Sequence, residues 1–326
     1  MSTTNEAFLR VARASEVEPG HPDAAEWLSS SVAPAGDDRG LLAMVHEQAR
    51  RHWAADPAAF EADWQRQTGQ PLPTWVTVDA GLLASAQAWL ATDTYTGERD
   101  YLASHPELLG SAADEAVGEA LLRVAEEVAE RYSALRQAAR DEGAEAAYRP
   151  LLMSIVANQF TRSDLAGQRA MLAASSEDLL SATVRDILAS RADSDEDDVP
   201  THRALALLDL ASLGEHEAVL DVVADPQRFR SLLDGLARRP GTAALAPAAQ
   251  FALTLPSTAE HTADLVFYLA VAAEIAGDTE RAQQLLSGAL RLAPDRPGTW
   301  VDWLAEIAQH HAEVLLLVPR LTQPRA

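Results

Sequence analysis

The sequence contains no cysteine and no lysine. Without cysteine, the chain can form no disulfide, no thiolate zinc site and no cysteine nucleophile. All 26 basic residues are therefore arginines. Arginine codons replacing lysine codons in a GC-rich genome explain this bias more simply than an escape from lysine-directed modification, so we draw no functional conclusion from it.

Long apolar runs and an excess of basic charge are also absent. No stretch reaches the roughly 18 apolar residues that a membrane span requires. Residues Met1 to Arg10 carry Glu6 early and no apolar core of signal-peptide length. The formal net charge is −23, which disfavours nucleic acid and anionic membrane surfaces because both attract basic faces. We expect a cytoplasmic protein that binds neither.

Aromatic residues are scarce, at 6% of the chain, whereas apolar residues, many of them alanine, reach 48%. Alanine favours helix more than any other residue. The composition therefore predicts an all-α fold. A length of 326 residues is sufficient for two or three units with their own cores.

Residues 1–78 form a Trp-rich region of short helices separated by breaks that contain proline and glycine. Five of the seven Trp residues fall within the first 89 residues: Trp27, Trp53, Trp64, Trp75 and Trp89. They could line an aromatic pocket for a small molecule. Packing between short helices explains them as well, and we favour packing.

Residues 79–190 are predicted to form a second helical array, with longer helices. The longest, over residues 112–142, carries an apolar stripe that is expected to pack on neighbouring helices. The stripe consists of Val117, Leu121, Val124, Val128 and Leu135.

Residues 191–200 form an acidic run closed by Pro200, and they predict a linker before a third region, residues 201–326. The alternating Asp193, Asp195 and Asp197 raise the possibility of a calcium loop. The glycine at the sixth position and the glutamate at the twelfth that an EF-hand loop needs are missing. We interpret the run as a solvated linker.

The last region contains two stretches that read alike and begin 34 residues apart, at Val266 and Trp300. In the first stretch, a Gly277-Asp278 turn precedes a helix that Asp278 can cap. Small and apolar residues lie on one face of that helix, at Ala282, Leu286 and Ala289, and Pro294 ends it.

This pattern resembles the tetratricopeptide repeat over about one and a half repeats, roughly from Ala263 to Gln309. The Trp, Gly and Tyr usual in the first helix are replaced here by other apolar or small residues. The resemblance implies a helical-hairpin array, that is, an α-solenoid that binds other proteins.

The resemblance also implies a concave groove lined from the first helix of each hairpin. Those positions are Asp264, Phe267, Val271, Glu274, Ile275, Val301 and Gln309. Because Asp264 and Glu274 stand where family members that hold a carboxylate carry basic or amide groups, the partner should be an apolar segment with basic residues. Alternatively, these residues only pack against the preceding helix or a second copy of the chain.

A second resemblance covers the segment from Trp89 to Leu109, including Thr94-Tyr95-Thr96-Gly97, and its continuation from Leu135 to Tyr148. Both look like helical modules of actinobacterial proteins associated with caspase-like CHAT domains. In such proteins the helical part resembles a sensor or adaptor, and a His/Cys dyad elsewhere performs the catalysis. That activity does not carry over to a chain without cysteine.

Catalytic and metal-binding motifs give no positive indication. The sequence contains no G-x-S-x-G, no GK[ST] loop and no G-x-G-x-x-G. His46 and His52 are six residues apart, whereas a zincin helix needs its two His four apart. The adjacent His310 and His311 diverge by about 100° on a helix. We expect neither a metal nor a cofactor.

The sequence therefore favours a non-catalytic adaptor or scaffold with a tetratricopeptide-like groove, for which a separate effector is a candidate partner. Two alternatives stay open. One is a helical enzyme or small-molecule binder with its pocket in the Trp-rich region. The other is a homo-oligomeric structural protein, in which a second copy buries the end of the array at Trp300, Trp303 and residues 314–318.

Overall fold

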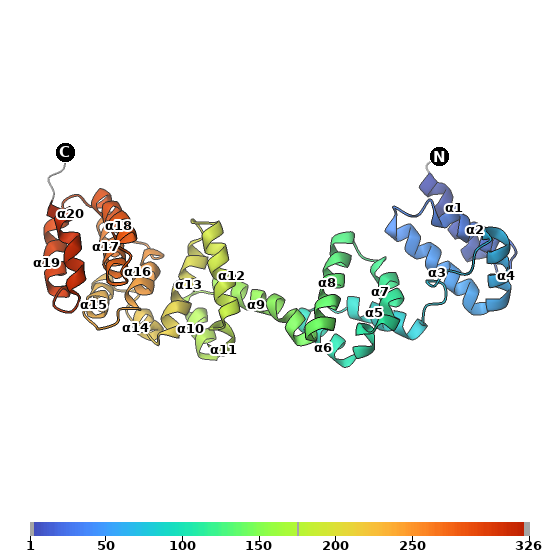
Figure 1. The fold of residues 1–326 in the computed structure, drawn as a ribbon, viewed down its shortest axis with the longest axis horizontal. Coiled ribbons are helices and arrows are strands. Elements are labelled where there is room, and N and C mark those ends of the chain that lie inside the picture. The colour runs from blue at the N-terminus through green and yellow to red at the C-terminus, as the bar shows by residue number, and fades with distance from the viewer. Residues whose placement is uncertain (1–2, 175, 323–326) are drawn as a thin grey trace. The chain divides into compact units, whose positions relative to one another are not determined.

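The computed structural model describes residues 3–174 and 176–322. Every regular element in these ranges is an α-helix or a short 3-10 helix (Figure 1), so the all-α prediction is confirmed. The chain forms two compact units, Met1–Leu152 and Met153–Ala326, and each is described by itself. Among the described residues, no helix combines the length and the apolar character needed to cross a membrane.

Four helices build the first apolar cluster of the amino-terminal unit. Small and branched side chains of the first three helices pack with Phe60 and Trp64 of the fourth. Asp38 and Asp56 accept hydrogen bonds from backbone N–H groups of the first helical turn that follows each of them, which satisfies amides that have no partner within the helix. The helices are α1 (Thr3–Glu16), α2 (Ala24–Val32), α3 (Arg39–Ala55) and α4 (Pro57–Thr68).

A second apolar cluster of the same unit surrounds the fully buried Trp89 and Tyr148. The indole N–H of Trp89 donates to the Tyr148 hydroxyl at 3.2 Å. All five Trp residues of the first 89 pack in or against these two clusters, as core packing predicts. The second cluster involves α5 (Ala80–Leu90), α6 (Tyr95–Ser104), η1 (Pro106–Leu109), η2 (Ser111–Ala113), α7 (Asp114–Leu121), α8 (Glu126–Glu142) and the first part of α9 (Ala144–Arg162).

The single long helix predicted over residues 112–142 is wrong, because α7 ends at Leu121 and α8 begins at Glu126. The Arg39 guanidinium donates a 2.7 Å hydrogen bond to the Leu121 carbonyl. That carbonyl would accept from the Ala125 N–H in a continuous helix. The apolar stripe is thus divided between two helices, and the Leu121 carbonyl at the break accepts from Arg39 and from the Val124 N–H.

The carboxy-terminal unit has one apolar core whose buried members run from Ala157 to Leu321. The end of α9 contributes to it. The other helices are α10 (Leu165–Ala174), α11 (Ser176–Leu179), α12 (Ala182–Ser194), α13 (Val199–Ser212), α14 (His216–Leu220), α15 (Pro226–Ala237), α16 (Leu245–Leu253), α17 (Ala259–Ile275), α18 (Thr279–Leu292), α19 (Pro297–Ile307), η3 (Ala312–Leu317) and α20 (Val318–Thr322).

The acidic run predicted as a linker, residues 191–200, lies inside this unit. α12 continues to Ser194 and α13 begins at Val199, and Asp198 caps α13 by accepting from the Thr201 N–H. Both helices bury side chains in the same core. The two-unit division therefore differs from the predicted boundaries at residues 78, 190 and 200. The acidic charge of residues 191–200 indicates that this segment is exposed to solvent. It does not show whether the helices before and after the segment share one core.

The hairpin of α17 and α18 has the turn, the cap and the buried face that the sequence predicted. Gly277 has a φ of +83°, which places it in the left-handed region that favours glycine. Asp278 then caps α18 by accepting from the Arg281 N–H, and Ala282, Leu286 and Ala289 are its buried residues, as predicted.

The last helices of the carboxy-terminal unit cover one another only in part. Val314 and Leu317 of η3 are buried, and η3 packs against α17, α18 and α19. Leu315 and Leu316 of the same segment are 48% and 65% exposed. Burial of this end by a second copy of the chain therefore stays a prediction.

Candidate functional site

The seven residues predicted to line a partner groove do not form one exposed surface. Asp264, Phe267, Val271 and Glu274 are buried, Ile275 and Val301 are half-buried, and only Gln309 is exposed. The first five lie on α17, Val301 lies on α19, and Gln309 follows α19. α17 buries residues on every side along its length, so it is a central helix and not the lining of a groove.

Asp264 fixes α19 against α17. Its Oδ1 accepts a 2.9 Å hydrogen bond from the Trp300 indole N–H and a 3.2 Å hydrogen bond from Nε of Arg296, which also forms an ion pair with Oδ2. Beside this group, the ring of Phe267 stacks on Trp300 with centroids 5.1 Å apart. This carboxylate is buried and already paired inside the unit, so it is not exposed to a basic segment.

The ring of Trp303 is also in contact with side chains of the same unit. The guanidinium of Arg230, on α15, lies 3.7 Å above its ring, and Tyr268 stacks on it with centroids 5.8 Å apart. The Tyr268 hydroxyl in turn donates to Asp234. Burial and the neighbouring Asp234 carboxylate raise the pKa of Tyr268. This cluster therefore joins α15, α17 and α19 internally.

Glu274 is the second predicted acid, and it accepts a 3.1 Å hydrogen bond from the Thr279 hydroxyl. Its exposed fraction is only 3%. Thr279 is the first residue of α18, so the contact stabilises the turn of the hairpin. Glu274 is not available to a partner in this conformation.

A network of charged residues joins α3 to the end of α7 in the amino-terminal unit. Nδ1 of the buried His46 lies 2.7 Å from Oε1 of Glu119, and Arg50 donates to Oε2 at 2.5 Å. Because an ionised carboxylate only accepts, the His46 imidazole must carry a proton on Nδ1. The ring of Trp75 stacks on His46, with centroids 3.7 Å apart and planes at 5°.

We call these contacts the Glu119 seam, together with the Arg39 bond to the Leu121 carbonyl and the 2.8 Å ion pair between Arg123 and Glu47. Burial alone would raise the pKa of the Glu119 carboxyl. The hydrogen bonds from His46 and Arg50 outweigh burial and hold that pKa below its usual value. The seam connects the two apolar clusters of the unit through ionic and polar contacts.

Three of the four histidines considered as metal ligands, His46, His52 and His311, have other partners. His52 lies 2.5 Å from the Ala14 carbonyl through Nε2, and His311 lies 3.0 Å from the Arg239 carbonyl. Within residues 3–174 and 176–322, no group of three or more His, Asp or Glu side chains is placed to hold a metal ion.

A cleft of about 320 Å³ lies beside the Glu119 seam. One wall comes from α3, and the facing wall comes from the segment before α5 and from α5 itself. Its lining combines arginines with apolar side chains: Glu47, Arg50, Arg51, Trp53, Ala54, Val76, Val78, Ala80, Leu83, Gln87 and Arg123. We call it the arginine cleft. The arginine cleft lies in the region whose Trp residues were considered as the lining of a ligand pocket. Of those Trp residues, only Trp53 lines it.

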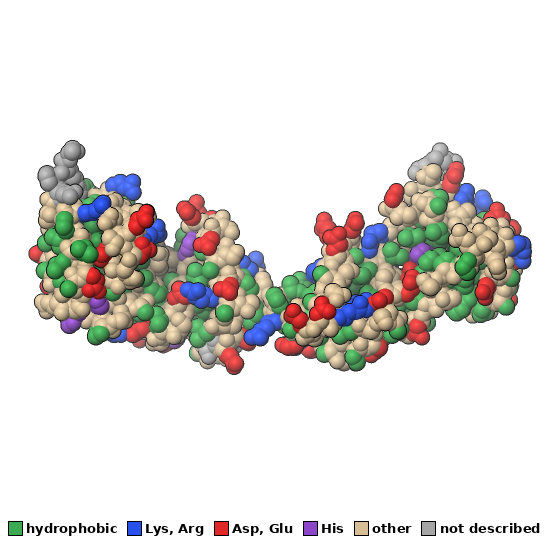
Figure 2. All heavy atoms as spheres, in the orientation of Figure 1, with side chains coloured by type: hydrophobic (Ala, Val, Ile, Leu, Met, Phe, Trp, Pro, Cys, Tyr) green, Lys and Arg blue, Asp and Glu red, His purple; other side chains and the backbone are tan. Residues whose placement is uncertain are grey.

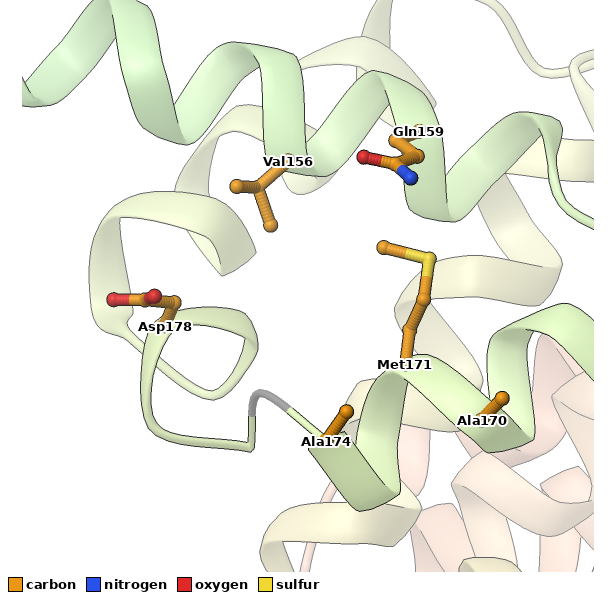
Figure 3. Close-up of a pocket in the computed structure, with 6 residues that line it drawn as sticks. All are labelled: Val156, Gln159, Ala170, Met171, Ala174 and Asp178. Atoms are coloured by element: carbon orange, nitrogen blue, oxygen red, sulfur yellow. The ribbon is translucent and has the colours of Figure 1, made fainter. Parts of the chain in front are cut away.

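A hollow of about 350 Å³ lies in the carboxy-terminal unit (Figure 3). Val156 and Gln159 of α9 face Ala170, Met171 and Ala174 of α10, and Asp178 of α11 stands at one side. We call it the α9–α10 hollow. Its lining is mainly apolar, and the flexible thioether of Met171 can adapt to differently shaped apolar groups.

Sequence reasoning missed both of these places. The arginine cleft gathers residues from 47 to 123 that share no local pattern. One readable signal was the Arg50-Arg51 pair within an acidic chain. The hollow had none, because alanine, valine and methionine are ordinary core residues.

Comparison of the chain with protein-family models, with curated proteins and with solved structures gave no match in any of the three.

Proposed function

We propose that this chain is a non-catalytic adaptor or scaffold that binds a protein segment in the α9–α10 hollow. The hollow carries the proposal because it leaves apolar side chains open around a space of about 350 Å³. Concave sites with a mainly apolar lining and a few polar groups are the usual places where proteins bind ligands. The proposed partner site is therefore not on α17, where four of the five predicted groove residues are buried.

The chemistry of the hollow favours an apolar segment with basic residues. Val156 and Met171 offer apolar contact, whereas Asp178 stands at the side as an exposed acid. Glu177 precedes it and is exposed too. A basic residue beside the inserted apolar group would pair with these carboxylates. Acidic side chains are also spread over the visible face of this unit (Figure 2).

A separate effector would supply any catalysis, as in the CHAT-associated proteins that residues 89–109 resemble. The long-range polar contacts of α17 and α19 support packing roles rather than a reacting group. On composition alone, we propose the cytoplasm as the compartment.

The test is an affinity capture from the native cell with four forms of the full chain. Ala170→Glu places a charge in the hollow at an exposed alanine, and Asp178→Arg reverses the charge at its side. Ala305→Glu adds the same charge to an exposed alanine of α19. We expect one partner to be retained by the wild type and by Ala305→Glu and lost by both hollow variants.

The captured partner is then purified and its affinity for the four forms is measured directly. Equal binding to all four forms, or equal loss with Ala305→Glu, would refute the hollow as the docking site. Capture of no partner in repeated experiments would count against the adaptor function itself.

A further inference from the structure

The arginine cleft carries a local excess of positive charge on a chain whose net charge is −23. Three arginines line it: Arg50, Arg51 and Arg123. Two carboxylates lie among them, Glu47 in the lining and Glu119 behind Arg50. Three positive and two negative groups leave one positive charge at the cleft. Composition alone gives no reason for such an excess here.

The three arginines differ in how firmly they are held. Arg50 donates to Glu119 at 2.5 Å and to the Trp75 carbonyl at 3.2 Å, and its side chain is 13% exposed. The Arg50 guanidinium is therefore held in place, and it would act on an anion in the cleft mainly through its positive charge. Arg51 is exposed and makes no ion pair and no side-chain hydrogen bond among the described residues, so its guanidinium retains its donors.

Arg123 is held only weakly. Its ion pair with Glu47 spans 2.8 Å, but the two side chains are 42% and 57% exposed. Exposed pairs of this kind are worth between zero and about 1 kcal/mol. An anion that enters the cleft can therefore displace Glu47 from Arg123 at little cost and gain a second guanidinium beside Arg51.

The rest of the lining is largely apolar. Trp53, Val78 and Leu83 are half-buried, so each presents part of its surface to the cleft. A volume of about 320 Å³ lies at the lower end of the range typical of small-molecule sites, roughly 300 to 1,000 Å³. A short chain or a single ring fits this space better than an extended segment.

We propose that the arginine cleft binds a small organic anion that carries an acidic head group on a short apolar body. The head group accepts hydrogen bonds from Arg51 and, after displacing Glu47, from Arg123. The apolar body lies against Trp53, Val78 and Leu83. Carboxylate and phosphate head groups share the required anionic oxygens, and arginine binds both through paired N–H donors. The site lies in the other unit from the α9–α10 hollow, so the two proposals stand independently.

The test uses isothermal titration of the full chain with octanoate, octyl phosphate, octanol and acetate. We expect saturable one-to-one binding of octanoate, octyl phosphate or both. Octanol lacks the charge and acetate lacks the tail, so each should bind at least about tenfold more weakly. The relative affinities of octanoate and octyl phosphate identify the head group. Absence of saturable binding by both anions would overturn the proposal.

Two variants with opposite expected effects separate binding from damage to the fold. Arg51→Gln removes the unpaired guanidinium and should weaken octanoate or octyl phosphate binding by about tenfold. Glu47→Gln removes the competitor for Arg123 and should strengthen binding severalfold, which a misfolded variant would not do.

Matched controls for charge lie in the same unit. Arg13→Gln and Glu61→Gln change the charge by the same amounts at exposed residues that make no side-chain ion pair or hydrogen bond in the described part of the chain. Both should leave the affinity unchanged. If either control matches its cleft variant, or if Glu47→Gln fails to strengthen binding, the proposed site is wrong.

Discussion

The indole N–H of Trp300 donates a 2.9 Å hydrogen bond to Oδ1 of Asp264 and so connects α19 to α17. Arg296 donates to the same carboxylate. These contacts explain why an acid stands in the buried, mainly apolar part of α17. The acid sets the position of α19, and its charge is compensated inside the unit.

Replacement of Asp264 by alanine should destabilise the carboxy-terminal unit by about 3 kcal/mol, because it removes the acceptor of a buried indole and of a charged guanidinium. Glu260→Ala, an exposed acid on the same helix, should change the free energy of unfolding by less than about 0.5 kcal/mol. Urea unfolding followed by circular dichroism measures both. Equal effects would show that Asp264 is not a structural contact.

Leu286 should be the most costly residue of α18 to truncate. Its side chain is fully buried in the hairpin, and Leu→Ala changes in cores cost about 2 to 5 kcal/mol. Leu292→Ala on the same helix removes the same atoms from a side chain that is 46% exposed, and should cost less than about 1 kcal/mol. Thermal unfolding of the two variants gives the comparison, and a similar loss in both would contradict the hairpin packing.

Acid should weaken the amino-terminal unit through Glu119. Because the pKa of this carboxyl is lowered in the folded chain, its stabilisation is present above the ordinary pKa of about 4.3 and is lost as the pH falls below it. Glu119→Gln should lower the free energy of unfolding near pH 7 by about 1 to 3 kcal/mol. It should also make the further loss of stability at acid pH less steep.

Trp fluorescence during urea unfolding at several pH values tests this, since five of the seven Trp residues lie in this unit. Glu61→Gln, an exposed acid of the same unit, serves as the control and should keep the steep acid dependence. An unchanged decline in Glu119→Gln would refute the assignment.

The buried tyrosines should ionise late in alkali. Burial, followed by the hydrogen bond to the Glu98 carboxylate, raises the pKa of Tyr132 to about 12. The pKa of Tyr148 is also raised, first by burial. A raised tyrosine pKa means that its stabilisation is intact below about pH 10 and disappears as the pH rises towards about 12.

Absorbance of phenolate at alkaline pH measures this ionisation. The folded chain should show a delayed component that urea abolishes and that Tyr132→Phe reduces. If all five tyrosines titrate together near pH 10 without urea, the expectation fails.

The α17–α18 hairpin could be predicted from sequence because its determinants are local. Gly277 supplies the positive φ, Asp278 supplies the cap, and the buried face repeats every three to four residues. The helix break after Leu121 could not be predicted in this way. The Leu121 carbonyl at this break accepts a hydrogen bond from Arg39, and no local pattern records that contact.

The groove prediction failed for a reason that the sequence did contain. Between Ala263 and Ile275, only Asp264 and Glu274 carry charge, and a helix that is apolar on all sides is expected to be buried. The resemblance to the tetratricopeptide repeat predicted that these positions line a groove, whereas the apolar composition of the helix predicted that they lie in a core. The composition was the better guide.

The Glu119 seam has a consequence for how the amino-terminal unit opens. Its contacts join guanidinium, imidazole, carboxylate and backbone carbonyl groups, and water can solvate these polar groups when the seam opens, whereas it gives no such compensation for exposed apolar packing. The cluster of α1 to α4 and the cluster around Trp89 should then behave as separate foldons. Amide hydrogens along the facing sides of α3 and α7 would exchange with solvent while the interiors of both clusters remain protected.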